Sequence, residues 1–337
     1  MKAPDFWHHP HQLLSLLLQP VVALYQWGYR LRRQLATPYR AVVPVICVGN
    51  IVAGGSGKTP VGLSLARMLQ QQGFRPVFVT RGYGGSAVGP LRVDVTRHDA
   101  TAVGDEALLL ADVAPTWVGK NKAATVEAAA ADGTHIILDD GLQNPTVAHD
   151  LALLVIDSDY GFGNGQLFPA GPMRERLASA MARVQGVVLI GEADGPELKN
   201  FQHVPVLRGN LISQLPLGHH QGDCYIAFAG IGRPEKFFGK LREMGLTLLA
   251  TRSFADHHVF SRQELAALQN MATSKNAKLI TTRKDYVRLP PELREGVRVL
   301  DISFTAFDPQ LLGGLMKKTS LPQSRLLLEK TTPRLPS

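Results

Sequence analysis

The chain has 337 residues, of which 45% are hydrophobic and 19% are charged. This balance excludes an intrinsically disordered chain, and the length corresponds to about two domains. The two cysteines, Cys47 and Cys224, are too few for a disulfide framework or a four-cysteine metal site, so a reducing compartment is expected. The net charge of +8 implies an acidic partner: nucleic acid, anionic lipid or a phosphorylated substrate.

The first 40 residues combine basic side chains with an apolar stretch. They carry five basic residues and one acidic residue, a net charge of +4 that is half of the total excess. Residues 13–27 are uncharged, but Pro20 interrupts them, and they are shorter than the roughly 20 residues that span a bilayer. No small-residue cleavage site typical of a signal peptide precedes the arginine cluster at 30–33.

Two interpretations of this segment stay open. In the first, it lies in a membrane interface, where Trp7, Trp27 and the leucines enter the headgroup boundary and the arginines contact lipid phosphates. In the second, it is an ordinary leucine-rich helix packed on the core. Elsewhere in the chain no run of basic residues is interleaved with aromatic ones, so nucleic acid is not the expected partner.

A phosphate-binding loop is predicted near the start of the main body. Residues 43–48 read VPVICV, which is typical of a buried strand, and GNIVAGGSGKTP (49–60) follows, with apolar residues at helical spacing after it. A strand, a glycine-rich turn and a helix N-terminus in this order form a phosphate cradle. The residues expected to bind nucleotide phosphates are Gly54, Gly55, Ser56, Gly57, Lys58 and Thr59.

Within this loop, Lys58 is expected to reach the β- and γ-phosphates and to act in catalysis, and Thr59 to hold Mg²⁺. The general pattern G-x-x-x-x-G-K-[ST] has glycine where this chain has Val52. The alternative is therefore a glycine-rich surface turn with an incidental Gly-Lys-Thr.

A second apolar run, THIILDD (134–140), ends in two carboxylates. Ligands bind at the carboxyl ends of strands in doubly wound sheets, so we expect Asp139 to be the metal carboxylate and Asp140 to be a second nucleotide contact. Adjacent residues on a strand point to opposite faces, which predicts different tasks for the two. The alternative is a strand end followed by an ordinary Asp-Gly turn.

Several further segments, together with the phosphate loop, identify a family. They are RGYGG (81–85), GDEALLLA (104–111), DDGLQN (139–144), FGNGQLFPAGPMRE (162–175), AGIGRPEKFF (229–238), FADHHVF (254–260) and TTRKDYVRL (281–289). In combination these segments resemble the tetraacyldisaccharide 4′-kinases, the lipid A 4′-kinases of Gram-negative envelope synthesis.

This resemblance implies transfer of the γ-phosphate of ATP to the 4′-hydroxyl of a tetraacylated glucosamine disaccharide 1-phosphate, with ATP and Mg²⁺ as cofactors. It also implies that the protein acts at the cytoplasmic face of the inner membrane, where the lipid surface is its partner. Neither nucleic acid nor an obligate protein partner is expected. The rival function is a membrane-associated P-loop ATPase switch. Such switches typically carry a lysine where this chain has Ala53.

The resemblance also implies roles for particular side chains. Asp105 matches the proposed catalytic aspartate of the family, although by sequence alone a helix N-cap is at least as good an interpretation. His257 is favoured over His258 as its partner, and Glu175 is expected to contact the metal shell or the ribose. Three further cations are candidates for contacts with substrate phosphate: Arg81, Lys120 and Lys122. The family pattern differs at Gly85, Asn144, Arg233 and Arg283, so no role is assigned to these side chains.

The apolar runs alternate with helical segments, which predicts an α/β fold built on a P-loop NTPase-type parallel sheet. We expect an N-terminal interfacial helical segment at 1–39, a P-loop kinase domain at 40–215, a smaller α/β domain at 216–305 and a C-terminal tail at 306–337. A cleft between the two domains is expected to close on substrate.

Overall fold

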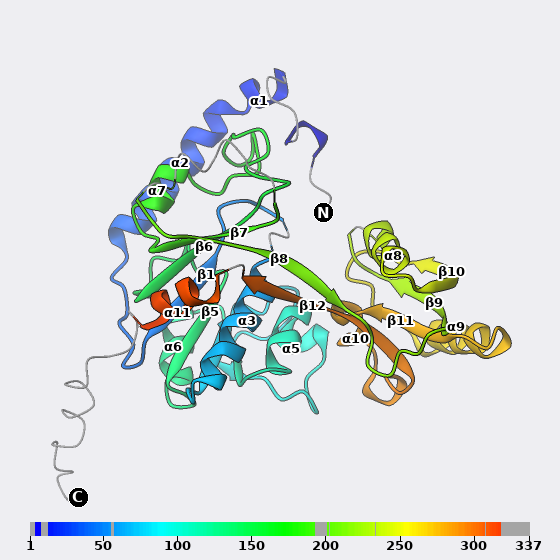
Figure 1. Cartoon of the computed structure of the whole chain (residues 1–337). Coiled ribbons are helices and arrows are strands. Elements are labelled where there is room, and N and C mark those ends of the chain that lie inside the picture. The colour runs from blue at the N-terminus through cyan, green and yellow to red at the C-terminus, as the bar shows by residue number, and fades with distance from the viewer. Residues whose placement is uncertain are drawn as a thin grey trace, which may run out of the picture.

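The computed structural model describes residues 4–7, 13–54, 57–192, 201, 203–232, 234–306 and 308–317. Gly55, Ser56 and Arg233 lie outside these ranges, as does the end of the chain. Figure 1 shows a larger and a smaller half, with α1 and α2 lying along the larger one.

Within the described residues the strands form one sheet in the order β10-β9-β11-β12-β8-β7-β6-β1-β5-β2-β4-β3. The strands of the larger half are β1 (Val45–Gly49), β2 (Pro76–Thr80), β3 (Leu91–Arg92), β4 (Thr116–Val118), β5 (His135–Asp139), β6 (Leu151–Asp157), β7 (Gly186–Ile190) and β8 (Val206–Gln214). Those of the smaller half are β9 (Cys224–Ala229), β10 (Thr247–Ser253), β11 (Lys278–Thr282) and β12 (Val297–Ala306). All neighbours are parallel except β3 with β4 and β8 with β12.

The helices of the larger half are α3 (Lys58–Gln71), α4 (Ala100–Val103), α5 (Asp105–Ala111), α6 (Lys122–Ala129), α7 (Leu177–Met181) and α11 (Pro309–Lys317). Those of the smaller half are α8 (Pro234–Glu243), α9 (Arg262–Ser274) and α10 (Arg283–Tyr286), with a 3₁₀ turn η3 (Pro291–Leu293). The N-terminal segment forms a 3₁₀ turn η1 (Asp5–Trp7), α1 (Leu13–Leu17) and α2 (Gln19–Leu35).

Both faces of the larger half are covered, as parallel sheets require. Along β1, Val45 and Cys47 face a core that includes residues of α2, α6 and α7, whereas Ile46 and Val48 face a core formed with α3, α5 and α11. The smaller half repeats this layering, with α8 on one face and α9 on the other. The α/β fold expected from the alternating pattern is therefore confirmed.

A two-stranded ribbon joins the halves. Residues 209–214 of β8 pair antiparallel with residues 301–306 of β12. The start of β8 pairs with β7 in the larger half, and the start of β12 pairs with β11 in the smaller half. Figure 1 shows β8 and β12 running side by side between the halves. The sheet thus continues across the expected domain boundary at 215, and the four-part division of the chain stays a prediction.

Two elements differ from the sequence-based expectation. The segment 206–214, at the end of the expected P-loop domain, forms β8, a strand that the apolar pattern did not predict. Part of the segment expected as a C-terminal tail forms α11, in which Leu315 is buried against the larger half. Both segments contain glycines and few β-branched residues, so their local pattern is weak and long-range packing decides their structure.

Candidate active site

A cleft of about 1990 Å³ lies where the larger half, the smaller half and α2 meet. Most of the side chains predicted from the sequence line it. From the larger half come Gly54, Gly57, Lys58, Thr59, Arg81, Asp105, Lys120, Lys122, Asp139, Asp140 and Arg174, and from the smaller half comes His257. Gly55 and Ser56 lie outside the described residues.

The phosphate-loop wall is built on the N-terminus of α3. Gly57 precedes the helix with φ 75°, a left-handed conformation that suits glycine, and no side chain caps the helix. Its first amide groups are therefore available to an anion, which is the arrangement of a phosphate site. Lys58 Nζ lies 3.3 Å from Asn50 Oδ1 and 3.7 Å from Asp140 Oδ1.

The two adjacent carboxylates follow the C-terminal end of β5. Asp139 is the last residue of the strand and is buried, and burial together with the nearby Glu106 and Asp140 raises its pKa to about 7. Burial acts in the same direction on the pKa of Asp140, but Lys58 and Arg174 outweigh it and lower that pKa, with Arg174 Nη1 2.8 Å from Asp140 Oδ2.

The sequence predicts that the side chains of Asp139 and Asp140 point to opposite faces of a strand, which requires an extended backbone at both residues. The strand ends at Asp139, and Asp140 has φ 50°, so strand alternation does not apply to it. Both side chains line the same cleft. The left-handed turn thus brings the second carboxylate to the side of the first.

Glu175 lies outside the cleft wall. It is almost fully buried, its carboxylate accepts two hydrogen bonds from Arg183 at 2.9 and 2.7 Å, and Tyr29 of α2 donates to it at 3.1 Å. Gln143, which does line the cleft, donates to the same carboxylate at 3.0 Å. Glu175 therefore joins α2 to the cleft through Gln143, and its expected contact with the nucleotide stays a prediction.

The oxygen donors at this end fit Mg²⁺ in kind. Asp139, Asp140 and Thr59 offer hard oxygen ligands, and Asp140 Oδ1 is buried without a hydrogen-bond donor. Among the described residues no group of three or more His, Cys, Asp or Glu side chains forms a metal cage. Magnesium is usually held by one or two carboxylates together with substrate phosphates and water, so two carboxylates suffice.

A glycine contact positions the start of α5, which carries Asp105. A Cβ atom at Gly85 would lie 2.7 Å from main-chain atoms of residues 102–104, and one at Gly104 would lie 2.4 Å from the carbonyl of Tyr83. The segment 81–85 and the turn before Asp105 therefore pack backbone against backbone. This contact leaves no room for a Cβ atom at position 85.

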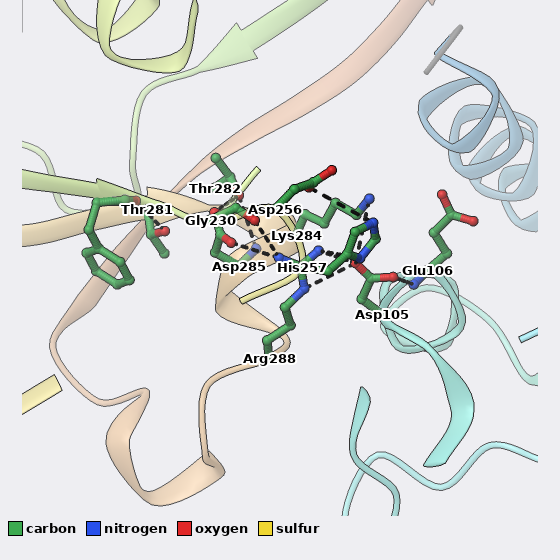
Figure 2. A network of polar contacts seen from close by, with 11 residues as sticks. Asp105, Glu106, Gly230, Asp256, His257, Thr281, Thr282, Lys284, Asp285 and Arg288 are labelled. Carbon is green, nitrogen blue, oxygen red and sulfur yellow. Dashed lines mark hydrogen bonds and ion pairs between the residues drawn. The ribbon is translucent and has the colours of Figure 1, made fainter. Parts of the chain in front are cut away.

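Asp105 is the first residue of α5 and is not its N-cap, which is Gly104. Its Oδ1 accepts the amide of Glu106 at 3.0 Å. Its Oδ2 accepts hydrogen bonds from Arg288, including one from Nε at 3.1 Å, and lies 3.3 Å from His257 Nδ1 (Figure 2). The carboxylate thus meets two side chains of the smaller half.

His257 and His258 have different surroundings. His257 has φ 59° and turns toward Asp105, with half of its side chain exposed. His258 lies 3.1 Å from Glu264 and stacks on Phe254 with ring centroids 4.8 Å apart. The structure therefore brings the histidine favoured on sequence grounds to Asp105 and ties the other into the start of α9.

The sequence left two cations near Asp105 without a role. Arg288 is bonded to it, and Lys284 Nζ lies 3.6 Å from its Oδ2. Both belong to the segment TTRKDYVRL, four residues apart, which is the spacing of one helical face and the only sequence signal that could have paired them. Arg283, in the same segment, pairs with Asp301 of β12 at 2.6 Å.

The other predicted cations also lie on the cleft. Lys122 is buried, and its Nζ donates to the carbonyl of Asp139 at 3.3 Å. Arg81 and Lys120 line the cleft without an assigned contact to the carboxylates. Asn144, a departure from the family pattern, accepts hydrogen bonds from the amide and hydroxyl of Thr146 and so shapes its own turn.

Comparison with known proteins gives a consistent result. A family model described as tetraacyldisaccharide-1-P 4′-kinase matches residues 14–319. The tetraacyldisaccharide 4′-kinase of Paramagnetospirillum magneticum is 49% identical over 321 residues, 94% of this chain and 98% of that protein. The tetraacyldisaccharide 4′-kinase of Rhodospirillum centenum is 48% identical over 325 residues, 94% of this chain and 96% of that protein.

Among solved structures, LpxK from Aquifex aeolicus in complex with ATP superposes with a TM-score of 0.74 at 24% sequence identity. The match covers 92% of this chain and 100% of that chain, and it supports the fold. The resemblance inferred from the motifs is confirmed, and the rival membrane-associated ATPase switch is not favoured. On the family model and the curated relatives, the chain belongs to the tetraacyldisaccharide 4′-kinase family, the kinases of lipid A biosynthesis.

Proposed function

We propose that this chain transfers the γ-phosphoryl group of ATP to the 4′-hydroxyl of a tetraacylated glucosamine disaccharide 1-phosphate. The observation that carries the proposal is a single cleft with three unlike walls. One wall is the uncapped N-terminus of α3 with Lys58, another presents Asp105 and His257, and the third is α2 with its apolar side chains. Phosphate, hydroxyl and acyl chain each have a matching surface.

At the nucleotide end, the amide groups at the start of α3 and the Lys58 ammonium bind the triphosphate. Phosphoryl transfer needs positioning and charge neutralisation more than covalent help, and both are tasks for these fixed donors. Lys58 is held near Asp140 and Asn50 in advance, so little reorganisation is required. Arg81 and Lys122 contribute positive charge farther along the same cleft.

Asp139, Asp140 and Thr59 would hold Mg²⁺ between the protein and the phosphates. The ion neutralises charge on the β- and γ-phosphoryl oxygens when it is bound. Arg174 holds one oxygen of Asp140 and leaves the other, Oδ1, without a hydrogen-bond donor. That oxygen is the one we assign to the metal.

At the acceptor end, Asp105 takes the proton of the 4′-hydroxyl. As the bond from the hydroxyl oxygen to the γ-phosphorus forms, the bond from that phosphorus to the bridging oxygen breaks, and ADP leaves with the electron pair. The proton resides on the Asp105 carboxylate until it passes to solvent. His257, 3.3 Å from that carboxylate and half exposed, provides the path by which the proton leaves.

The membrane surface enters through α1 and α2. One side of α2 is fixed to the larger half, with Val22 buried and Tyr25 donating to the carbonyl of Arg174 at 3.1 Å. The other side exposes large apolar side chains, and exposed Arg30 and Arg32 lie on the same helix. The exposed apolar set is Leu14, Leu16, Leu17, Val21, Leu24, Trp27, Leu31 and Leu35.

No helix among the residues that the structure describes is both long and apolar enough to span a bilayer. A face of this composition, flanked by arginines, suits an interfacial helix on anionic lipid. Because Val21 and Leu24 also line the cleft, an acyl chain could pass from the interface to the active site along α2. We therefore propose that the chain works as a peripheral protein on the cytoplasmic face of the inner membrane.

The deciding experiment offers the purified protein labelled ATP, Mg²⁺ and the tetraacylated disaccharide 1-phosphate in mixed micelles. We expect label on the lipid at the 4′ position and none without Mg²⁺. Release of free phosphate alone, stimulated by a protein partner, would instead support an ATPase switch. Label on a water-soluble sugar phosphate, with none on the lipid, would refute the proposed acceptor.

A further inference from the structure

We propose that Arg288 is a positioning residue that holds the Asp105 carboxylate in register for proton transfer. This inference rests on the function proposed above, and specifically on Asp105 as the proton acceptor. Nothing in the sequence motifs assigned Arg288 a task. Figure 2 shows its guanidinium group directed at Asp105 from the smaller half.

The guanidinium group is fixed on its own side before it meets Asp105. Its Nη1 donates to the carbonyl of Gly230 at 2.8 Å and to Asp285 Oδ1 at 3.0 Å. Asp285 is itself fully buried, and its Oδ2 accepts the hydroxyl of Thr282 at 2.7 Å. The Arg288 side chain is only 3% exposed, so it has little freedom to swing away. The Arg288 guanidinium group is therefore held in one orientation.

The Nε and Nη2 atoms of the Arg288 guanidinium group both reach one oxygen of Asp105, and Nη2 also lies 3.3 Å from His257 Nδ1. Nε lies 3.1 Å from Oδ2, and Nη2 donates to the same atom. His257 Nδ1 and the Lys284 ammonium also approach Oδ2, at 3.3 and 3.6 Å. Oδ2 thus accepts both hydrogen bonds from Arg288 and lies near Lys284 and His257, whereas Oδ1 accepts the amide of Glu106.

This pair spans the two halves of the molecule, since Arg288 and Asp105 are 183 residues apart in the sequence. A buried ion pair contributes little net stability, because desolvation offsets most of the attraction between its charges. Asp105 lines the cleft and Arg288 is buried behind it, so the pair has a second use, which is to orient the carboxylate. A displacement of the order of 1 Å in a reacting group costs about 100-fold in rate.

The pH dependence of the rate distinguishes a positioning role from a purely structural one, because a loss of stability alone would not shift the pH–rate profile. Burial raises the pKa of Asp105, but Lys284, Arg288 and His257 outweigh it and hold the pKa below its ordinary value. The charged side chains that contact Asp105 are His257, Lys284 and Arg288 of the smaller half. Behind them, Asp256 pairs with His257 and Asp285 pairs with Arg288, and Glu106 follows Asp105 on its own helix with its carboxylate turned away (Figure 2). Removing the Arg288 charge therefore raises the pKa of Asp105, and the acidic limb of the rate profile moves to higher pH.

The test compares Arg288→Gln, Arg288→Lys and Lys284→Gln with the unaltered protein in the micelle assay, across pH. For Arg288→Gln we expect a fall in kcat of about 100-fold, an acidic limb at higher pH and little change in the KM for ATP. Arg288→Lys restores the charge without the guanidinium group, so the limb returns while the rate stays low. Lys284→Gln shifts the limb with a smaller fall in rate.

Arg294→Gln is the matched control, because Arg294 lies six residues after Arg288 and donates to the carbonyls of Leu289 and Val287 rather than to Asp105. It should change thermal stability without moving the limb. If Arg288→Gln leaves the limb in place and its rate falls no further than that of Arg294→Gln, Arg288 is a structural residue and the inference is wrong. Should Arg288→Gln not fold, Arg288→Lys decides: full activity overturns the inference.

Asp105→Asn, measured in parallel, separates this inference from the function beneath it. If the unaltered protein phosphorylates the lipid and Asp105→Asn does so equally fast, the kinase stands, while Asp105 and Arg288 both lose their roles. If the unaltered protein does not phosphorylate the lipid, the proposed function itself has failed.

Discussion

The two chemical walls of the cleft are built in opposite ways. The phosphate-loop wall is local and open: Lys58 is 13% exposed, Asp140 is 34% exposed, and both follow adjacent strands of the same half. The wall around Asp105 is assembled from distant parts of the chain and is closed, with Asp105 at 4% and Arg288 at 3% exposure. The nucleotide end therefore depends on one half alone, whereas the acceptor end depends on both halves meeting.

The ribbon between β8 and β12 sharpens this difference. It links the halves by two strands, and α3 packs against it, with Ser64 Oγ donating to the carbonyl of Phe304 in β12 at 3.1 Å. A change in the angle of the ribbon would move His257 and Arg288 relative to Asp105 while Lys58 kept its partners. Four experiments, from the largest expected effect to the smallest, test how far the two walls and their surroundings act independently.

The largest effect is expected for Asp105→Asn. Loss of the proton acceptor should lower kcat by about 100- to 10,000-fold, the usual contribution of acid–base catalysis, while ATP binding persists. Steady-state kinetics measures kcat, and titration with a fluorescent ATP analogue measures ATP binding. Asp99→Asn is the control, because Asp99 caps α4 through the amide of Ala102 and asparagine preserves such a cap. A parallel loss of ATP binding in Asp105→Asn would show that the walls are coupled.

Lys58→Met should follow, with a fall in kcat of about 100- to 1,000-fold and weaker ATP binding, because a fixed donor to the developing phosphate charge is lost. The acidic limb of the pH profile should stay where it is, since Lys58 does not contact Asp105. Titration calorimetry with ATP and steady-state kinetics give the two readings. Arg75→Met, exposed beyond the far end of α3, is the control. A shifted limb would contradict separate walls.

A smaller effect concerns access rather than chemistry. Leu16, Leu17 and Leu35 are exposed on α1 and α2 at 64%, 67% and 75% and do not line the cleft. Replacing each by glutamine should weaken partition to anionic vesicles by roughly tenfold per site in a flotation assay. Turnover of dispersed substrate should change little. Val42→Gln, which removes an equally exposed apolar residue away from these helices, should leave partition unaltered.

The smallest effect is expected for Arg283→Gln. Arg283 pairs with Asp301 on the surface, and exposed pairs of this kind contribute less than about 1 kcal/mol to the free energy of unfolding. A double-mutant cycle with Asp301→Asn in urea denaturation measures the coupling. A coupling free energy of several kcal/mol, as in a buried network, would contradict this and would mean that the Arg283–Asp301 pair is a main contributor to stability.

The two walls also differ in how far the sequence predicts them. Lys58, Thr59, Asp139 and Asp140 were predicted from strand and loop patterns. The two aspartates directly follow an apolar run, Lys58 and Thr59 end the glycine-rich loop after another run, and neighbouring parallel strands bring their ends together. Asp105 and His257 were paired only through family resemblance. Arg288 was not identified at all, since no local pattern reveals that the smaller half packs its loop onto α5.

The same reasoning applies to the fold. The buried strands β1, β2, β5, β6 and β7 are short apolar runs, and the sequence predicts them closely. The strand β8 was missed, because Gly209 and Asn210 interrupt its pattern and its pairing with β12 joins segments far apart in the chain. Contacts that depend on how two halves meet lie beyond the information of a local window.

The left-handed backbone at Asp140 and His257 has a consequence for evolution and engineering. A left-handed backbone costs a residue with a Cβ atom about 1 kcal/mol of stability relative to glycine. Asp140 and His257 both adopt this backbone and both line the cleft. Glycine at position 140 would relieve this strain, but it would also remove the ion pairs of Asp140 with Lys58 and Arg174. At both positions the strained backbone is therefore a cost in stability that accompanies the side chain needed for the proposed chemistry.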